Sequence, residues 1–322
     1  MGEQNLIEVK NLKKYFGGGG FLNKKPETKA VDNVSFSIAK GDTFGLIGES
    51  GCGKSTVART MIRLYDPTSG SVIFDGIDIA RLGENELMPY RRRMQMIFQD
   101  PYASLNPRMT VKRIVSEPLN AHDICSKSEY EERVADALSM VGLEPSHMGR
   151  YPHEFSGGQR QRIGIARAII IRPDFIICDE PISALDVSIQ AQVVNMLQTL
   201  QEQLGLTYCF IAHDLAMVKY ISKRMAVMYV GQLVEVSPSE ELYRAPLHPY
   251  TIGLMKSVPI ADPKLAKMKD EVSIEGEIPS PSNPPSGCRF RTRCPKCMEI
   301  CKEVSPMLKE ITPNHFVACH LF

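Results

Sequence analysis

The sequence lacks long hydrophobic runs. Apolar stretches such as residues 168–171 are interrupted by Arg172 and Pro173, whereas a membrane-spanning helix needs about 18 apolar residues in succession. Residues 1–5 are polar, and no basic segment followed by an apolar one opens the chain, so we expect no secretory signal. The sequence therefore predicts a soluble protein of the cytoplasm.

The chain also lacks an excess of charge of one sign. It contains 38 Lys and Arg residues against 37 Asp and Glu residues, which gives a formal net charge of +1. Proteins that bind nucleic acid through bulk electrostatics carry a basic excess. The balance of charge therefore argues against nucleic acid as a partner.

Cysteine is too scarce for a disulfide scaffold, and it is unevenly distributed. The 322 residues include nine cysteines, which are too few to stabilise a chain of this length through disulfides. Their number is also odd, so they could not all pair with one another. Five of them lie between positions 288 and 319. This segment needs an explanation other than core packing.

Hydrophobic periodicity indicates an α/β fold. Short apolar runs at 43–47, 175–178 and 207–212 predict strands, and helical periodicity at 130–141 and 189–204 predicts helices that each end at a glycine. Strands that alternate with helices are typical of a largely parallel sheet.

The composition changes near residue 250. Proline recurs through residues 259–287, which predicts an extended linker. We therefore expect one domain over residues 1–250 and an extension over 251–322, the last part of which, 288–322, contains the five clustered cysteines.

A phosphate-binding loop is predicted at residues 48–56, which match the pattern G-x-x-x-x-G-K-[ST] between a strand and a helix. Glycines let successive N–H groups point at phosphate oxygens, and the helix N-terminus adds its positive end. Lys54 would bind the β- and γ-phosphates, and Ser55 would offer its hydroxyl to Mg²⁺. The predicted nucleotide-binding residues of the loop are Gly48, Ser50, Gly51, Cys52, Gly53, Lys54, Ser55 and Thr56.

Two adjacent carboxylates follow the apolar run at 175–178. Asp179 is suited to hold Mg²⁺ through water, and Glu180 is suited to act as general base on the attacking water. With a phosphate loop upstream, the pair predicts ATP hydrolysis.

A Ser-Gly-Gly-Gln segment lies just before the helix that leads to this strand. In this order with the other two motifs, it resembles the signature of ATP-binding cassette (ABC) proteins, and the resemblance covers about residues 5–245. It implies their fold, with a parallel-sheet core, an antiparallel β subdomain and a helical signature subdomain. In that family two cassettes form a dimer, and the signature of one caps the γ-phosphate of ATP held by the other. The matching residues are Ser156, Gly157, Gly158 and Gln159.

The resemblance implies roles for further residues. Gln99 would contact Mg²⁺ and the attacking water, and His213 would contact the γ-phosphate, so that Gln99, Glu180 and His213 form the catalytic set. The metal would be held by Ser55, Gln99 and Asp179. The loop that couples the two sites across the dimer would be Ser183, Ala184, Leu185 and Asp186. An aromatic residue before the first glycines should stack on adenine, and Phe16 is the first choice and Tyr15 the second.

Three further features resemble the ATPase subunits of dipeptide and oligopeptide importers. These are the segment 99–108, the His-Pro-Tyr sequence at 248–250 and the cysteine-rich tail. Tyr102 and Arg108, with Gln-Arg-Gln-Arg after the signature, are similar to the F-type of the two ATPases in such systems. The resemblance implies a D-type ATPase partner, two membrane permeases and an external solute-binding protein, with this subunit peripheral at the cytoplasmic face of the cell membrane.

Two other functions stay open at this point. The same machinery imports nickel in related systems, and the ATPase does not touch the solute. A soluble ABC ATPase that acts on nucleic acid is the other alternative, which the single signature and balanced charge disfavour.

The tail predicts a metal site. Its cysteines are spaced C-x₅-C-x₂-C-x₃-C-x₁₇-C, and four thiolates can hold a tetrahedral Zn²⁺ or a [4Fe–4S] cluster. The resemblance favours the cluster, with zinc as the alternative. The implied ligands are Cys288, Cys294, Cys301 and Cys319, with Cys297 as an alternative because Cys294-x₂-Cys297 is itself a plausible pair. We expect the role of the group to be structural.

Overall fold

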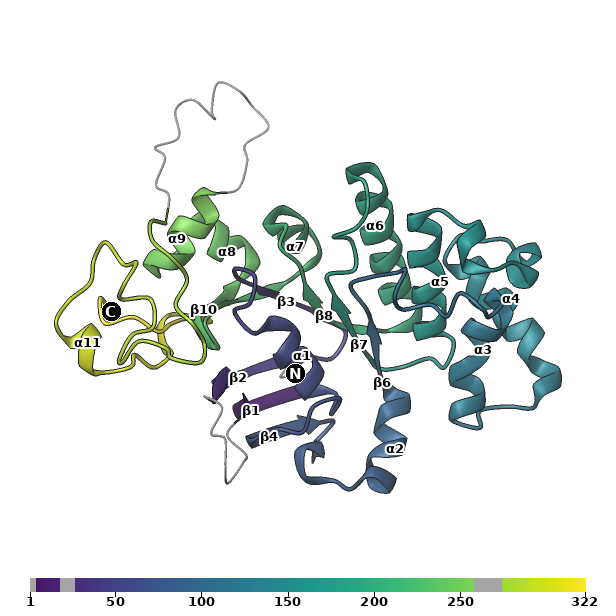
Figure 1. Cartoon of the computed structure of the whole chain (residues 1–322), viewed down its shortest axis with the longest axis horizontal. Coiled ribbons are helices and arrows are strands. Elements are labelled where there is room, and N and C mark those ends of the chain that lie inside the picture. The colour runs from purple at the N-terminus through teal and green to yellow at the C-terminus, as the bar shows by residue number, and fades with distance from the viewer. Residues whose placement is uncertain (1–3, 18–26, 258–273) are drawn as a thin grey trace. The chain divides into compact units, whose positions relative to one another are not determined.

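The computed structural model describes residues 4–17, 27–257 and 274–322 (Figure 1). They form two compact units, which are described one at a time. The first unit contains Ala39–Asp42 and Leu82–Ala212, and the second contains Asn5–Ile38, Thr43–Arg81 and His213–Phe322. Pro259 and Pro263 of the predicted linker lie outside the described residues.

The sheet of the first unit consists of parallel strands. Strand β7 (Phe175–Asp179) pairs with β6 (Met94–Ile97) on one side and with β8 (Thr207–Ile211) on the other. Every residue of β7 and β8 is buried, which explains why both strands are uninterrupted apolar runs rather than alternating ones. The predicted parallel α/β class is confirmed here.

Helices make up the rest of this unit. Three of them, α3, α4 and α5, pack on one another, and α5 also contacts α6 (Figure 1). The helices are α2 (Glu84–Arg93), α3 (Val111–Ala121), α4 (Tyr130–Met140), α5 (Gly157–Ile169) and α6 (Val187–Leu204). Gly205, with φ 67°, ends α6 in the left-handed conformation, as the sequence predicts for a glycine that follows a helix.

The second unit contains a mixed sheet. Strand β3 (Thr43–Ile47) is parallel to β9 (Arg224–Tyr229), which forms an antiparallel hairpin with β10 (Gln232–Pro238). Strands β12 (His315–Val317) and β11 (Lys309–Thr312) then continue the sheet, antiparallel, from the edge of β10. Two strands of the C-terminal extension thus belong to the same sheet as the strand that precedes the phosphate loop.

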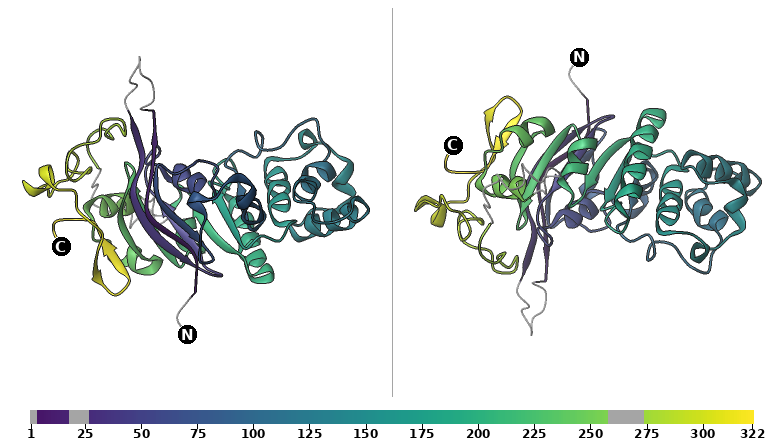
Figure 2. Two further views of the ribbon diagram at one scale, coloured as in Figure 1. Left: turned by 90° about the horizontal axis from the view of Figure 1, so that it is seen from below. Right: turned by 90° about the horizontal axis from the view of Figure 1, so that it is seen from above.

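The same unit holds an antiparallel sheet in the order β2-β1-β4-β5. Its long strands β1 and β2 run alongside each other in Figure 2. Its strands are β1 (Asn5–Phe16), β2 (Thr28–Ala39), β4 (Ser69–Phe74) and β5 (Ile77–Asp78), and the unit's helices are α1 (Lys54–Met61), α7 (Leu215–Ile221), α8 (Ser239–Arg244), α9 (Pro249–Lys256) and α11 (Ile300–Glu303).

A buried carboxylate joins the extension to β10. Glu235 of β10 has no exposed surface, and it accepts the backbone N–H groups of Leu247 and His248 at 2.8 and 2.9 Å. Nε2 of His315 in β12 lies 2.7 Å from Oε1 of Glu235, the oxygen that also accepts the N–H of Leu247. A charge without water needs such partners, so three distant segments converge on one side chain.

Aromatic rings fill the space beside Glu235. Tyr229 of β9, Tyr250 of α9 and Phe290 of the tail lie with ring centroids 4.7 to 5.4 Å apart, and all three side chains are buried. Residues 274–287, the described part of the predicted linker, contain no helix or strand. The boundary predicted near residue 250 stays a prediction, but residues on both sides of it share this core.

His248 generates a prediction for the pH dependence of stability. Burial lowers its pKa from 6.5 to about 4, against the opposing effect of Glu235. Protons therefore bind the unfolded chain more readily than the folded one. The free energy of unfolding should be unaffected by this group above about pH 6.5 and should fall by about 3 kcal/mol as the pH decreases toward 4.

The matched variant is His248→Asn, because an asparagine oxygen can accept the N–H of Tyr250 in place of His248 Nδ1. Urea unfolding between pH 7 and 4 should show a shallower loss of stability in the variant than in the wild type. Parallel pH profiles would show that His248 does not titrate in this window.

Candidate functional site

The predicted phosphate loop connects β3 to α1 in the second unit. Three of its glycines have positive φ, with Gly48 at 149°, Gly51 at 76° and Gly53 at 110°. A Cβ at Gly48 would lie 2.2 Å from the carbonyl oxygen of Met228, and one at Gly53 would lie 2.2 Å from that of Ala30. The backbone can therefore follow this path only with glycine at both positions.

Lys54 is the first residue of α1 and is 4% exposed. Its ammonium donates to the carbonyl oxygens of Gly48 and Glu49 at 2.8 and 3.0 Å, so the positive charge is held within the loop. No side chain caps the start of α1, because Gly53 occupies the N-cap position. The arrangement presents an ammonium and a helix N-terminus to an anion.

Cys52 lies within this loop and is buried. Burial raises the pKa of its thiol, and the nearby Lys54 only partly offsets that rise. The thiol is therefore uncharged and packs in the interior, which agrees with Cys52 binding phosphate through its backbone N–H.

The two aromatic candidates for adenine stacking end β1 and differ in their surroundings. The ring of Phe16 is 37% exposed and packs edge-on against Tyr65, with centroids 5.4 Å apart. The hydroxyl of Tyr15 donates to Asp32. Phe16 thus offers a partly open ring face, and its stacking role stays a prediction.

In the first unit, β7 ends in the two predicted carboxylates. Asp179 is fully buried and Glu180 is 6% exposed, and Glu180 has a φ of 49°, which turns the chain sharply at the end of the strand. The amide of Gln99 donates to Glu180 Oε2 at 2.5 Å. The structure therefore brings together two members of the predicted catalytic set.

The signature begins α5. Ser156 is its N-cap and accepts the N–H of Gln159 at 3.4 Å, while Gln159 Oε1 accepts the N–H of Ser156 at 3.1 Å. A Cβ at Gly158 would lie 2.7 Å from the side chain of Ile189. The glycines therefore allow α5 to start close to α6.

The predicted coupling loop lies next to the signature. Ser183 Oγ donates to the carbonyl oxygen of Glu180 at 3.1 Å, and Asp186 is the N-cap residue of α6. The side chain of Leu185 would be 3.8 Å from a Cβ at Gly157. The coupling loop thus contacts the backbone of Glu180 through Ser183 and lies beside the start of the signature through Leu185.

The segment 99–108, which resembles peptide-importer ATPases, rests on α5. The guanidinium of Arg160 lies 4.0 Å from the ring centroid of Tyr102, which is 59% exposed. Arg167 donates to the carbonyl oxygen of Ser104 at 2.7 Å. Arg160 of the Gln-Arg-Gln-Arg sequence and Arg167, further along α5, therefore hold this segment against the helix.

His213 follows β8 and precedes α7, and it is exposed. Its neighbour Asp214 fixes the turn by accepting the N–H groups of Ala216 and Met217 at 2.9 and 3.2 Å. The phosphate loop and His213 belong to the second unit, and Gln99, Asp179 and Glu180 belong to the first. That they meet at one nucleotide stays a prediction.

The tail cysteines lie close enough to influence one another. The pKa of Cys288 is raised to about 11, chiefly by burial, against a lowering by a hydrogen bond to the backbone of Phe290 and with smaller increases from Cys301, Cys294 and Cys319. The N–H of Cys288 donates to the carbonyl oxygen of Cys301 at 2.8 Å. Free thiols with raised pKa values are protonated at neutral pH.

The expected metal site stays a prediction. Within residues 4–17, 27–257 and 274–322, no group of three or more His, Cys, Asp or Glu side chains is positioned to hold a metal ion. Cys297 is exposed, and His315 is engaged with Glu235 rather than with the cysteines. The donor atoms are suitable for iron or zinc, but their arrangement is not a ready site.

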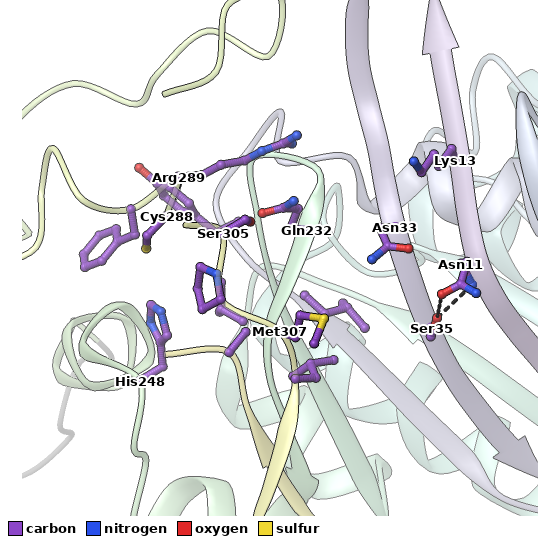
Figure 3. A pocket seen from close by; sticks show the side chains of 17 residues that line it. Asn11, Lys13, Asn33, Ser35, Gln232, His248, Cys288, Arg289, Ser305 and Met307 are labelled. Carbon is purple, nitrogen blue, oxygen red and sulfur yellow. Dashed lines mark hydrogen bonds between the residues drawn. The ribbon is translucent and has the colours of Figure 1, made fainter. Parts of the chain in front are cut away.

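A cavity of about 590 Å³ lies in the second unit between β1, β2 and β10 and the tail. Figure 3 shows Asn11, Asn33 and Ser35 on one side of it and Cys288, Ser305 and Met307 on the other. None of the predicted nucleotide-site residues lines it.

Two arginines of the tail join it to distant parts of the second unit. Arg289 pairs with Asp32 and with the carbonyl oxygen of Val230, and Arg293 pairs with Glu49 in the phosphate loop. No local pattern marks either residue, because their partners are more than 50 positions away in sequence.

Comparison with known proteins agrees with these motifs. Residues 31–183 match the family model described as ABC transporter, and residues 234–301 match the one described as oligopeptide/dipeptide transporter, C-terminal region. The oligopeptide transport ATP-binding protein AppF of Bacillus subtilis is 54% identical over 99% of this chain and 98% of its own. The chain belongs to the ABC transporter ATP-binding proteins. The putative oligopeptide transport ATP-binding protein YkfD of the same organism is 57% identical to this ABC ATPase over 98% of the chain and 95% of the relative.

A solved structure agrees on the fold. The ATP-binding cassette MJ0796, in a dimeric post-hydrolysis state bound to ADP and Pi, aligns with a TM-score of 0.65 at 30% identity. The match covers 72% of this ABC ATPase and 98% of that chain. The predicted cassette fold is confirmed, and so is ATPase activity as the enzyme class. No helix among the described residues is long and apolar enough to cross a membrane.

Two loop glycines allow a direct test of the backbone argument. Gly51→Ala and Gly53→Ala both place a side chain at positive φ, at a cost of about 1 kcal/mol each. Only the Cβ at Gly53 would meet a backbone oxygen, whereas the space around Gly51 is open. We expect Gly53→Ala to lower Tm by several degrees more than Gly51→Ala in thermal unfolding, and equal Tm values would contradict the proposed path of the loop.

Proposed function

We propose that this ABC ATPase hydrolyses ATP to power the import of dipeptides or oligopeptides through a membrane transporter. The observation that carries the proposal is identity of 54% and 57% to proteins named for oligopeptide transport, over nearly the whole chain. The match to the oligopeptide/dipeptide transporter C-terminal region supports it independently. The nickel alternative and the nucleic-acid alternative have no comparable support.

The proposed chemistry assigns one role to each motif. The phosphate loop binds the triphosphate, with Lys54 on the β- and γ-phosphates and Phe16 against adenine. Glu180 takes a proton from the attacking water, Gln99 orients the same water, and His213 contacts the γ-phosphate. Ser55, Gln99 and Asp179 present hydroxyl, amide and carboxylate oxygens, which suit Mg²⁺, and the ion would neutralise phosphate charge when bound.

The contact between Gln99 and Glu180 supports this assignment. An amide that donates to the carboxylate at 2.5 Å fixes the direction of Glu180 at the end of β7. A displacement of Gln99 would therefore alter the base directly. The exposed segment that follows Gln99 contains Tyr102, which packs on Arg160. A permease that docked on this segment could therefore act on hydrolysis by moving Gln99.

The proposed assembly contains two cassettes. Each signature, Ser156–Gln159, caps ATP held by the partner's phosphate loop, and Ser183–Asp186 couples the two sites. We propose a D-type ATPase as the second cassette, two permease subunits in the membrane and an external solute-binding protein. In this assembly the chain is peripheral, at the cytoplasmic face of the cell membrane.

The general-base role predicts the behaviour of Glu180→Gln. The variant should bind ATP and favour the closed dimer, because an amide keeps the size and the hydrogen bond, but its kcat should fall at least about 100-fold. Phosphate release and size-exclusion chromatography with ATP measure the two effects. Wild-type turnover in the variant would rule out Glu180 as the base.

Peptide import predicts a cellular phenotype. A strain that lacks this gene should lose uptake of a radiolabelled dipeptide or oligopeptide, and the wild-type gene, but not Glu180→Gln, should restore it. Normal peptide uptake without the gene, combined with loss of nickel uptake, would support the alternative solute.

Metal binding by Cys288, Cys294, Cys301 and Cys319 is a further part of the proposal, with Cys297 as the alternative ligand. The backbone hydrogen bond from Cys288 to the carbonyl oxygen of Cys301, at 2.8 Å, supports it by bringing two of these cysteines together. We assign the metal no step in ATP hydrolysis. Anaerobically purified protein should contain about four iron atoms per chain and be brown. One zinc ion per chain in a colourless protein would favour the zinc alternative. A protein that contains neither iron nor zinc would rule out the metal site.

A further inference from the structure

The phosphate loop contains an acid. Glu49 directly follows Gly48, and its side chain is 24% exposed. A carboxylate here stands within a loop that is proposed to bind a polyanion, and like charges at short range repel. Its position calls for a compensating charge.

Arg293 of the tail supplies that charge. Its Nη1 donates to Glu49 Oε2 at 2.8 Å and its Nη2 to Oε1 at 3.1 Å, so both carboxylate oxygens are engaged. The Arg293 side chain is 5% exposed, and Nη1 also donates to the hydroxyl of Tyr229 at 3.3 Å. A two-point, mostly buried pair of this kind is fixed in geometry and weakly screened by salt.

The backbone of Glu49 is held from the same side. Its N–H donates to the hydroxyl of Tyr250 at 2.9 Å, and its carbonyl oxygen accepts the Lys54 ammonium at 3.0 Å. Tyr250 is buried against Tyr229 and Phe290. The position of Glu49 therefore affects the position of Lys54, the residue assigned to the β- and γ-phosphates.

We propose that Arg293 is a positioning residue for ATP, which neutralises Glu49 and holds it away from the phosphates so that the C-terminal extension sets the affinity of the phosphate loop. The proposal rests on the assignment of residues 48–56 as the ATP site. It gives the tail a function in nucleotide binding that requires no metal.

The test uses the full-length protein and the affinity for ATP. Arg293→Gln leaves Glu49 uncompensated and should weaken ATP binding by about tenfold or more, with a rise in KM and a smaller change in kcat. The deficit should shrink as salt is increased, because the repulsion is electrostatic. Glu49→Gln alone should bind ATP at least as tightly as the wild type.

The double variant separates charge compensation from a merely structural contact. Glu49→Gln combined with Arg293→Gln removes both charges and should restore ATP affinity to within about threefold of the wild type. If it binds ATP as weakly as Arg293→Gln, or if Arg293→Gln binds ATP normally, the proposal is overturned. Should Arg293→Gln fail to fold, Arg293→Lys can be used instead, because it keeps the charge but loses the two-point geometry. Arg293→Lys should retain ATP affinity, and adding Glu49→Gln to it should not increase that affinity.

Two controls complete the design. Arg291→Gln removes the same charge from the same segment, but the Arg291 guanidinium donates to Ser286 of the tail rather than to the phosphate loop, so the ATP affinity of this variant should be unchanged. Lys54→Met should lose ATP binding. Retention of binding by Lys54→Met would disprove the assigned ATP site itself, which distinguishes that failure from a failure of the Arg293 proposal.

Discussion

The burial of Glu235 constrains most of the second unit. A carboxylate with no exposed surface is unstable unless its oxygens are fully hydrogen-bonded. Its partners are the backbone N–H groups of Leu247 and His248 and the ring of His315. The turn into α9 and the strand β12 therefore have to lie beside β10, and this places Tyr250 and Arg293 next to the phosphate loop.

The extension thus packs into the same unit as the phosphate loop and contacts it directly. Tyr250 and Arg293 hold Glu49, and Arg289 binds Asp32, the partner of the Tyr15 hydroxyl. Contacts from the extension consequently reach both the phosphate loop and the end of β1 where adenine is expected to stack. The His-Pro-Tyr sequence has a physical meaning here, since its histidine caps α9 and its tyrosine binds the loop.

The motif-bearing parts of the fold could be predicted because their signals are local. The strand before Gly48, the helix after the phosphate loop and the strand that ends at Asp179 are each marked by a few consecutive residues. The attachment of the tail could not be predicted, because Glu49 and Arg293 are 244 positions apart and a buried glutamate in β10 looks like any exposed one in the sequence. The metal site stays a prediction, since cysteine spacing reports suitable ligands but not their arrangement.

Strand β12 covers the edge of β10 through the pairs Glu235–Val317 and Val236–Phe316. A cassette expressed without its extension would present β10 as a bare edge, with open N–H and C=O groups, an unpartnered buried acid and exposed tyrosines. Such edges recruit other strands. The truncated protein should therefore self-associate into aggregates, which would make this part of the chain a determinant of the cassette's solubility.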